Sequence, residues 1–277
     1  MTNIPTITLN NGVPMPQLGL GVWQVPDNDA HAAVAVALSR GYRSIDTAAL
    51  YNNEEGVGRA IAESGIPRDE LFITTKLHNR DQGYDATLRA FDTSATKLGL
   101  DHIDLYLIHW PQPAHNLYTE SWRAMERLHV EGRVRAIGVS NFQPAHLDRL
   151  AIESDTTPAV NQIELHPYLG QQTLRDYHAA HGIATEDWSP LGQGGPLLTD
   201  PTITTVATAH NKTPAQVVIR WHLQHGHIVI PKSVTPSRIA ANIDVFDFTL
   251  TPSEMATIDG LDRHQRLGPD PDTFHQS

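Results

Sequence analysis

The chain has 277 residues, a formal net charge of −11 and no cysteine. The acidic balance argues against sequence-independent binding of nucleic acid, which requires a basic surface, and the lack of cysteine excludes disulfides and thiolate chemistry. Because no apolar run approaches the length of a membrane span and the N-terminus lacks a signal-peptide pattern, we expect a cytoplasmic protein with no membrane partner.

The first predicted element is a β-hairpin. Two short segments with alternating polarity, residues 6–9 and 13–16, flank the sequence Asn10-Asn11-Gly12. An Asn-Gly pair supplies the positive φ values that a tight turn requires. We expect this hairpin to cover one end of the core.

Eight apolar runs follow, and each has the composition of a β-strand. They begin near Leu18, Tyr42, Leu71, Ile103, Val134, Ala159, Ile183 and His227. The segments between them have helical periodicity, and Gly41 and Gly99 stand where left-handed helix ends are expected. Regular alternation of strand and helix predicts a parallel sheet, and eight such units predict a (β/α)8 TIM barrel with the hairpin as an N-terminal cap. The last interval is the longest and leaves room for an extra helix.

No feature of the sequence divides this barrel into parts. There is no Ser/Gly-rich linker, low-complexity tract or block of like charge. We therefore expect residues 1–277 to form a single domain, since α/β barrels commonly reach this length. Nothing in the sequence requires a subunit interface, so we expect a monomer.

Four titratable side chains of different kinds stand at or just beyond the ends of predicted strands. Asp46 and Tyr51 follow the second strand. Lys76 ends the third strand and His109 the fourth. In a TIM barrel the carboxyl ends of the strands meet at the face that carries the active site. Any one of these residues could be a capping group or an ordinary surface side chain, but as a set they predict a catalytic site.

The four residues suit the protonation of a carbonyl oxygen. A free tyrosine has a pKa of about 10 and is a poor proton donor near neutral pH. The ammonium of Lys76 would lower the pKa of Tyr51, and Asp46 would hold that ammonium in place. A neutral His109 could hydrogen-bond the oxygen that Tyr51 protonates. The sequence has no Gly-x-Ser-x-Gly motif, so acyl transfer lacks its usual signature.

A candidate phosphate site follows the eighth strand. Thr235 and Pro236 have the pattern of an N-cap followed by the first residue of a helix. The first free amides of that helix would lie near Lys232 and Arg238, which suits an anion. Both cations could instead be solvated surface charges.

Three aromatic side chains could wall a substrate pocket. Trp23 and Trp110 follow the first and fourth predicted strands, and His78 follows the third. The alternative is that they fill the rim of the barrel, and we assign them to the pocket. The polar, proline-rich tail after Leu261 should form a short flap beside it.

Five sequence motifs resemble those of the aldo-keto reductases, and most closely those of the bacterial 2,5-diketo-D-gluconate reductases. They are residues 41–48 (GYRSIDTA), which precede Tyr51 and Asn53-Glu54, and residues 104–111 (DLYLIHWP), 138–142 (GVSNF), 161–167 (NQIELHP) and 230–234 (IPKSV). The resemblance covers the chain from about Thr6 to Phe248.

This resemblance implies an NADPH-dependent oxidoreductase that reduces the aldehyde or ketone groups of small carbonyl compounds. Dicarbonyls and keto-sugar acids such as 2,5-diketo-D-gluconate are the substrates it implies. Tyr51 would be the general acid. Lys76 and Asp46 would tune its pKa, and His109 would orient the carbonyl. The cofactor would contact Ser140, Asn141, Gln162, Trp188, Ser189, Leu191, Gln193, Lys232, Ser233, Val234, Arg238 and Asn242.

Two other functions remain open from the sequence. The sixteen histidines could serve a metal-dependent hydrolase, and His225 and His227 have the spacing of a ligand pair. These two precede the eighth strand, however, and so lie at the face of the barrel away from the active site. His178 and His181 should face solvent, and we predict no metal. The second alternative is a non-catalytic NADPH-binding regulator, against which the intact catalytic set argues.

Overall fold

Eight parallel strands form the barrel that the sequence predicts. The computed structural model describes residues 4–275 of the chain. Its barrel strands are β3 (Leu20–Gly21), β4 (Ser44–Asp46), β5 (Phe72–Leu77), β6 (Ile103–Ile108), β7 (Val134–Ser140), β8 (Val160–Glu164), β9 (Ala184–Trp188) and β10 (Ile228–Val229). Each strand pairs in parallel with the next one along the chain. Parallel bridges join Leu18 to Val229 and Gly21 to Lys232, so the first and last strands meet and the barrel closes.

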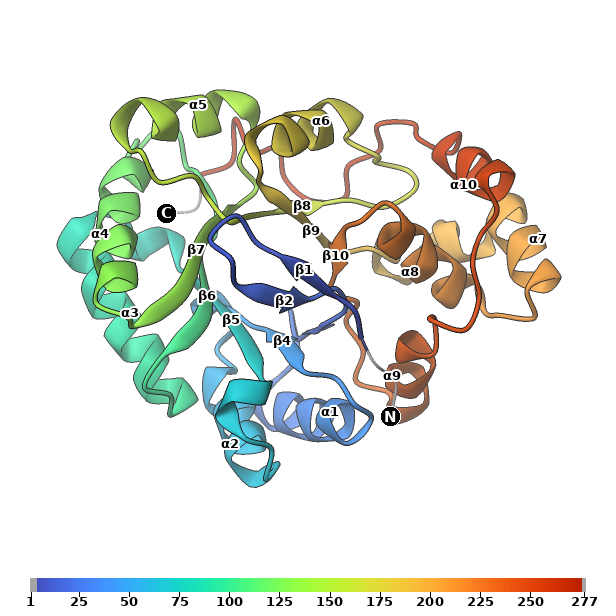
Figure 1. Ribbon diagram of the computed structural model, residues 1–277, viewed down its shortest axis with the longest axis horizontal. Coiled ribbons are helices and arrows are strands. Elements are labelled where there is room, and N and C mark those ends of the chain that lie inside the picture. Colours follow the sequence, from blue (N-terminus) through green and yellow to red (C-terminus); the bar gives the residue numbers. More distant parts are fainter. Residues whose placement is uncertain (1–3, 276–277) are drawn as a thin grey trace.

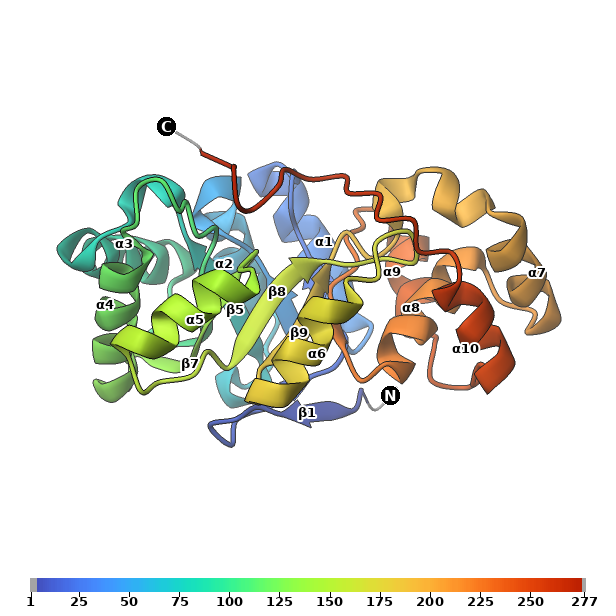
Figure 2. The ribbon, with the colours of Figure 1, turned by 90° about the horizontal axis from the view of Figure 1, so that it is seen from above.

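The N-terminal hairpin covers one end of the barrel. Its strands β1 (Thr6–Thr8) and β2 (Pro14–Pro16) are antiparallel, and Gly12 has a φ of +83° in the turn between them. Leu9 and Met15 are buried against the apolar side chains of the barrel interior. Figure 1 shows the hairpin across the middle of the ring, and Figure 2 shows it at the edge opposite the C-terminal segment. The predicted cap is confirmed, and the other end of the barrel is left for chemistry.

Helices cover the outer side of the strands (Figure 1). They are α1 (Asp27–Ser39), α2 (Glu54–Glu63), α3 (Tyr84–Leu98), α4 (Tyr118–Val130), α5 (Pro144–Glu153), α6 (Gln172–His181), α7 (Pro201–Ala209), α8 (Pro214–Gln224), α9 (Pro236–Ile243) and α10 (Pro252–Asp259). They pack on the strands through a core of large side chains that includes Tyr42, Trp122 and Trp221. The extra helix expected in the longest interval is α7. Between residues 4 and 275, no helix is long and apolar enough to cross a membrane.

Glycines with positive φ end two helices where the sequence predicts. In α3, Phe91, Ala95 and Leu98 recur every three or four residues and belong to the buried face of the helix. Gly99 then takes a φ of +66°, and Gly41, after α1, takes a φ of +101°. A side chain would strain the backbone in this conformation. Each glycine therefore lets the chain turn from the helix toward the next strand.

A buried carboxylate ties three neighbouring strands together near the hairpin end. Asp104, on β6, is fully buried, and its two oxygens accept hydrogen bonds from Arg68 at 2.6 Å and Arg135 at 2.7 Å. It also accepts from the backbone amide of Ile73 on β5 at 2.8 Å. Because Arg135 lies in β7, one side chain links β5, β6 and β7. Asp104 is the first residue of the motif at residues 104–111, and these contacts explain why that motif begins with a carboxylate.

We predict that Asp104→Asn lowers the free energy of unfolding by about 2–4 kcal/mol, because it leaves two arginines beside a neutral amide. Asp92→Asn is the matched control. The ion pair of Asp92 with Arg133 is also 2.6 Å long, but its side chains are 60% and 36% exposed. Its loss should therefore cost less than about 1 kcal/mol. Urea unfolding of both variants measures the difference, and equal losses would contradict this account.

Candidate active site

A cavity of about 1100 Å³ opens at the carboxyl ends of the barrel strands, away from the hairpin. Asp46, Tyr51 and His109 line it, and Lys76 is bonded to Asp46. Its wall also contains the predicted cofactor and substrate residues Ser140, Asn141, Gln162, Trp188, Ser189, Leu191, Gln193, Lys232, Ser233, Val234, Arg238, Asn242, Trp23 and Trp110. The structure therefore brings together the polar groups that the sequence places at separate strand ends.

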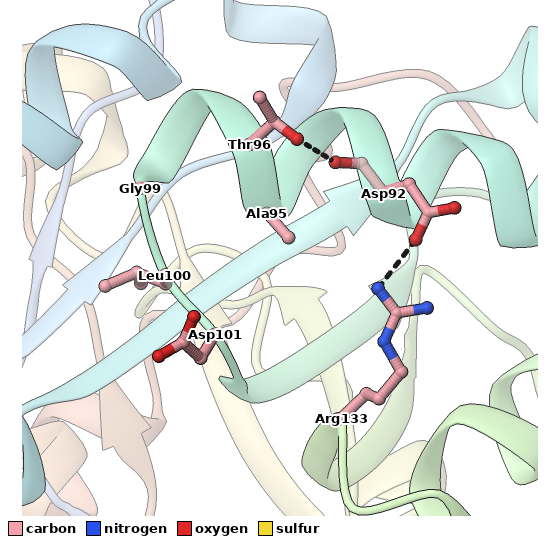
Figure 3. A pocket seen from close by; sticks show the side chains of 7 residues that line it. All are labelled: Asp92, Ala95, Thr96, Gly99, Leu100, Asp101 and Arg133. Carbon is pink, nitrogen blue, oxygen red and sulfur yellow. Dashed lines mark hydrogen bonds and ion pairs between the residues drawn. The ribbon is translucent and has the colours of Figure 1, made fainter.

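A second depression, of about 480 Å³, lies near the other end of the barrel (Figure 3). It is bounded by the last turns of α3, by the segment before β6 and by Arg133 before β7. Its charged groups are Asp101 and the ion pair of Asp92 with Arg133. Its seven lining residues include no set of groups that could act together on a substrate, so we place the active site in the larger cavity.

Lys76 and Asp46 form a buried ion pair beneath the cavity. The ammonium of Lys76 lies 2.6 Å from Oδ1 of Asp46 and also donates to the carbonyl of Thr47 at 3.0 Å. Both side chains are almost wholly buried. Burial by itself would lower the pKa of Lys76, but Asp46, with smaller contributions from Tyr51 and Glu186, outweighs burial, so the pKa of Lys76 is raised. The ammonium therefore stays charged at neutral pH.

Tyr51 lies beside this ammonium. It ends the short 3-10 turn η1 (Ala49–Tyr51), and its ring centroid is 5.1 Å from Nζ of Lys76. Burial is the largest influence on the pKa of Tyr51 and raises it, while Lys76 lowers it by less. Lys76 thus acts in the predicted direction, but the net pKa of the phenol is above its usual value. Tyr51 holds its proton at neutral pH, as a proton donor must.

His109 completes the group as a neutral imidazole. Its ring lies 5.7 Å from that of Tyr51, measured between centroids, in an edge-to-face arrangement. Burial lowers the pKa of His109 well below its usual value, and the charge of Lys76 adds to this effect. Within the described part of the chain, its Nδ1 has no hydrogen-bond partner. The predicted neutral His109 agrees with this environment.

Gln162 connects the ion pair to a second carboxylate, Glu186, which the sequence analysis missed. Nε2 of Gln162 donates to Asp46 at 2.8 Å and to Glu186 at 2.9 Å. Glu186 lies two residues before Trp188 on β9, so the two side chains share one face of the strand. The sequence did contain a signal for Glu186. Trp188 is predicted to face the cavity, so a carboxylate two residues earlier on the same strand is expected on the inner face of the barrel.

A chain of hydrogen bonds fixes the side chains beside Gln162. Nε1 of Trp188 donates to Oδ1 of Asn141 at 2.8 Å, and the Asn141 amide donates to the carbonyl of His109 at 3.0 Å. Asn141, Ser189 and Gln193 all have left-handed backbone conformations, with φ of 65°, 49° and 56°. Such conformations are strained for residues with side chains and tend to gather at functional sites. Here all three line the cavity.

The far end of the cavity has the character of an anion site. Lys232 and Arg238 are exposed there, and neither makes an ion pair with any carboxylate of residues 4–275. Arg238 lies in the first turn of α9, whose N-cap residue Thr235 provides no side-chain cap. The first amides of α9 are therefore free to face an anion beside two cations.

The C-terminal segment forms the predicted flap. Leu267 and Gly268 line the cavity, and their amides donate to buried Glu164 at 2.6 and 2.9 Å. A Cβ atom on Gly268 would lie 2.5 Å from the Trp188 ring, so only glycine fits at this approach. Figure 2 shows the segment running along the edge of the barrel opposite the hairpin.

The structure places two histidines elsewhere than the sequence indicated. His178 does not face solvent. It is fully buried on the inner face of α6, within 2.9 Å of both Asn161 and Thr185, because the outer faces of β8 and β9 carry polar side chains there. His78 is half-buried and does not line the cavity. Its Nδ1 accepts the Arg80 amide at 3.0 Å, which turns the ring toward its own backbone.

His227 belongs to a buried cluster behind β9. Asp187, His222 and His227 are close enough to one another to hold a metal ion. However, Nδ1 of each imidazole already lies at hydrogen-bond distance from the same oxygen of Asp187, at 2.6 and 2.8 Å. These hydrogen bonds account for the cluster, and the absence of a metal stays a prediction.

Comparisons with known proteins agree with this geometry. Residues 15–263 match the aldo/keto reductase family. The chain is 61% identical over 271 residues to an aldo-keto reductase of Mycolicibacterium smegmatis, with 98% of each chain covered. It is 55% identical over 275 residues to the methylglyoxal reductase DkgA of Yersinia pestis, with 99% of each covered. The solved structure of a Gox0644 mutant in complex with NADPH superposes with a TM-score of 0.95 at 49% identity, covering 99% of this chain and 100% of that chain. This chain therefore belongs to the aldo/keto reductase family.

Proposed function

We propose that this protein is an NADPH-dependent reductase of small, neutral dicarbonyl compounds and that Tyr51 is its general acid. The observation that carries the proposal is the buried pair of Lys76 with Asp46 beside a protonated phenol and a neutral imidazole, all at one cavity. Its similarity to a methylglyoxal reductase supports the same substrate class.

The lining of the cavity fits a nicotinamide cofactor. NADPH, when bound, supplies the hydride that attacks the carbonyl carbon. Both amide hydrogens of Gln162 are used by carboxylates, so its Oε1 is left as an acceptor for a carboxamide group. Trp188 is held by Asn141 and lines the same cavity, where its ring is available for stacking. Lys232 and Arg238 would meet the 2′-phosphate.

The remaining residues move and hold the proton. Tyr51 gives the proton of its hydroxyl to the carbonyl oxygen as negative charge develops there. Lys76 then stabilises the phenolate that remains, and Asp46 keeps Lys76 in place. A hydrogen bond from neutral His109 to the same carbonyl oxygen would fix the orientation of the substrate.

The charges on the cavity wall favour neutral substrates over acids. Among the described residues that line it, the cations are Lys232 and Arg238, which we assign to the cofactor. Trp23 and Trp110 also line the cavity, and an indole offers a carboxylate one N–H donor but no positive charge. The net charge of −11 also opposes the approach of anions. We therefore favour dicarbonyls such as methylglyoxal over keto-sugar acids such as 2,5-diketo-D-gluconate.

A non-catalytic NADPH-binding regulator has less support. Such a protein would need the anion site and the stacking ring, but it would have no use for a buried ion pair aimed at a phenol. Membership of a family of reductases also argues for turnover.

We predict that wild-type protein oxidises NADPH with methylglyoxal and reduces 2,5-diketo-D-gluconate less efficiently. Tyr51→Phe should lower kcat for methylglyoxal about 10²- to 10⁴-fold, because it removes only the donated proton. Its dissociation constant for NADPH should stay close to that of the wild type. The loss of NADPH absorbance measures turnover, and Tyr84→Phe, on α3 outside the cavity, is the control. A Tyr51→Phe enzyme with more than about a tenth of wild-type kcat would exclude this role.

We predict that Arg238→Ala raises the dissociation constant for NADPH about tenfold to a hundredfold, since charge-assisted hydrogen bonds to phosphate are strong. Affinity for NADH, which lacks the 2′-phosphate, should change little. Quenching of tryptophan fluorescence can measure both cofactors. Arg40→Ala removes an equal charge from an exposed site away from the cavity and controls for net charge. Equal weakening of NADPH and NADH would show that Arg238 does not read the phosphate.

A further inference from the structure

Glu186 is a second carboxylate buried beneath the catalytic group. It lies within β9, is 0% exposed, and does not reach the cavity wall. Its Oε2 accepts a hydrogen bond from Nε2 of Gln162 at 2.9 Å, and the same nitrogen donates to Asp46 at 2.8 Å. One amide group therefore joins two carboxylates, of which only Asp46 has a cation as its partner.

These two contacts fix the orientation of the Gln162 amide. A primary amide has two N–H groups, and each now faces one carboxylate. If the amide turned over, its oxygen would face the ionised carboxylate of Asp46, which is repulsive, and Oε2 of Glu186 would lose the N–H that it accepts here. Gln162 lines the cavity, so the fixed orientation leaves its Oε1 as an acceptor for the carboxamide of a cofactor. Glu186 thereby acts on the cofactor site through Gln162.

The surroundings of Glu186 favour its neutral form. Lys76 provides one buried positive charge, and Asp46 already balances it. Asp187 follows on the same strand, and the apolar Ile228 stands opposite on β10. Across the described residues, Oε1 of Glu186 has no hydrogen-bond partner, whereas an ionised carboxylate needs donors to both oxygens.

The effect on pKa agrees with this geometry. The pKa of Glu186 is raised from 4.5 to about 8, mainly by burial and also by the charge of Asp46. The hydrogen bond from Gln162 and the charge of Lys76 oppose it by less. An ionised Glu186 would also raise the pKa of Tyr51 further. The proton on Glu186 therefore keeps a second anion away from the acid.

We propose that Glu186 is a positioning residue that works as a neutral acid: it holds the amide of Gln162 in its cofactor-binding orientation and leaves Asp46 as the only anion beside Lys76. This inference rests on the proposed function. In this proposal Glu186 carries a proton but does not touch the substrate. The site is fully active only while Glu186 keeps that proton, which sets an upper pH limit on activity.

The proton can be detected through stability, without any assay of activity. Between pH 4.5 and about pH 8 the folded protein holds a proton on Glu186 that the unfolded chain releases. The free energy of unfolding of the wild type should therefore fall with rising pH in this window, by an amount that Glu186→Gln removes. Relative to wild type, Glu186→Gln should become more stable as the pH rises.

Asp247→Asn is the control, at an exposed carboxylate that does not line the cavity. The hydrogen bond from Lys212 lowers the pKa of Asp247 below its usual 3.8. The stability that this carboxylate contributes is therefore complete above pH 3.8 and is lost only at lower pH. Its difference from wild type should be flat from pH 5 to about pH 9. Urea unfolding across this range would overturn the proposal if Glu186→Gln were equally flat or lost relative stability as the pH rose.

Cofactor binding tests the positioning role. Glu186→Ala should weaken NADPH binding about fivefold, the value of one hydrogen bond, and Glu186→Gln should restore most of that loss. In the wild type kcat should fall as the pH rises through about 8, and this fall should be absent in Glu186→Gln. Equal weakening in both variants, or an unchanged fall of kcat, would overturn the proposal. If no carbonyl supports NADPH oxidation at all, the proposed function fails, while the unfolding data still decide whether Glu186 holds a proton.

Discussion

The ion pair between Lys76 and Asp46 is the interaction on which the rest of the site depends. Either charge alone would be costly to bury, and removing one partner of such a pair typically costs about 3–5 kcal/mol. The pair is tolerated because the carbonyl of Thr47 and the amide of Gln162 satisfy its remaining hydrogen-bonding groups. With the pair in place, a permanent cation lies 5.1 Å from the ring of Tyr51. The stability of the barrel mouth and the acidity of the phenol therefore depend on the same two residues.

The barrel keeps stability and chemistry at opposite ends. At the hairpin end, apolar side chains fill the interior and Asp104 ties three strands together. At the other end the interior becomes polar, the backbone is strained at Asn141, Ser189 and Gln193, and the C-terminal segment packs over the cavity. Strain and buried charge destabilise a fold, so they can persist only where the rest of the structure compensates for them. The well-packed end supplies that compensation.

Much of the fold and of the candidate site could be predicted from the sequence, because the carboxyl ends of the strands in a parallel barrel converge on one face. All eight strands begin within two residues of the predicted positions. What could not be predicted are contacts across the barrel. Strand periodicity places Glu186 inside but does not show that it shares Gln162 with Asp46. It also does not show that His178 packs on polar strand faces, or that burial outweighs Lys76 in setting the pKa of Tyr51. These depend on three-dimensional distances between residues far apart in the chain.

The most direct test of the account compares Lys76→Met with the double variant Lys76→Met/Asp46→Asn. The single variant leaves an unpaired buried carboxylate, whereas the double variant leaves no charge at this pair of positions and should regain much of the lost stability. If the cation is what supports proton donation by Tyr51, both variants should still bind NADPH, and kcat for methylglyoxal should be lowered about 10²-fold or more in both. A double variant with near-normal stability and more than about a tenth of wild-type kcat would contradict the account, because it would show that the pair serves the fold alone.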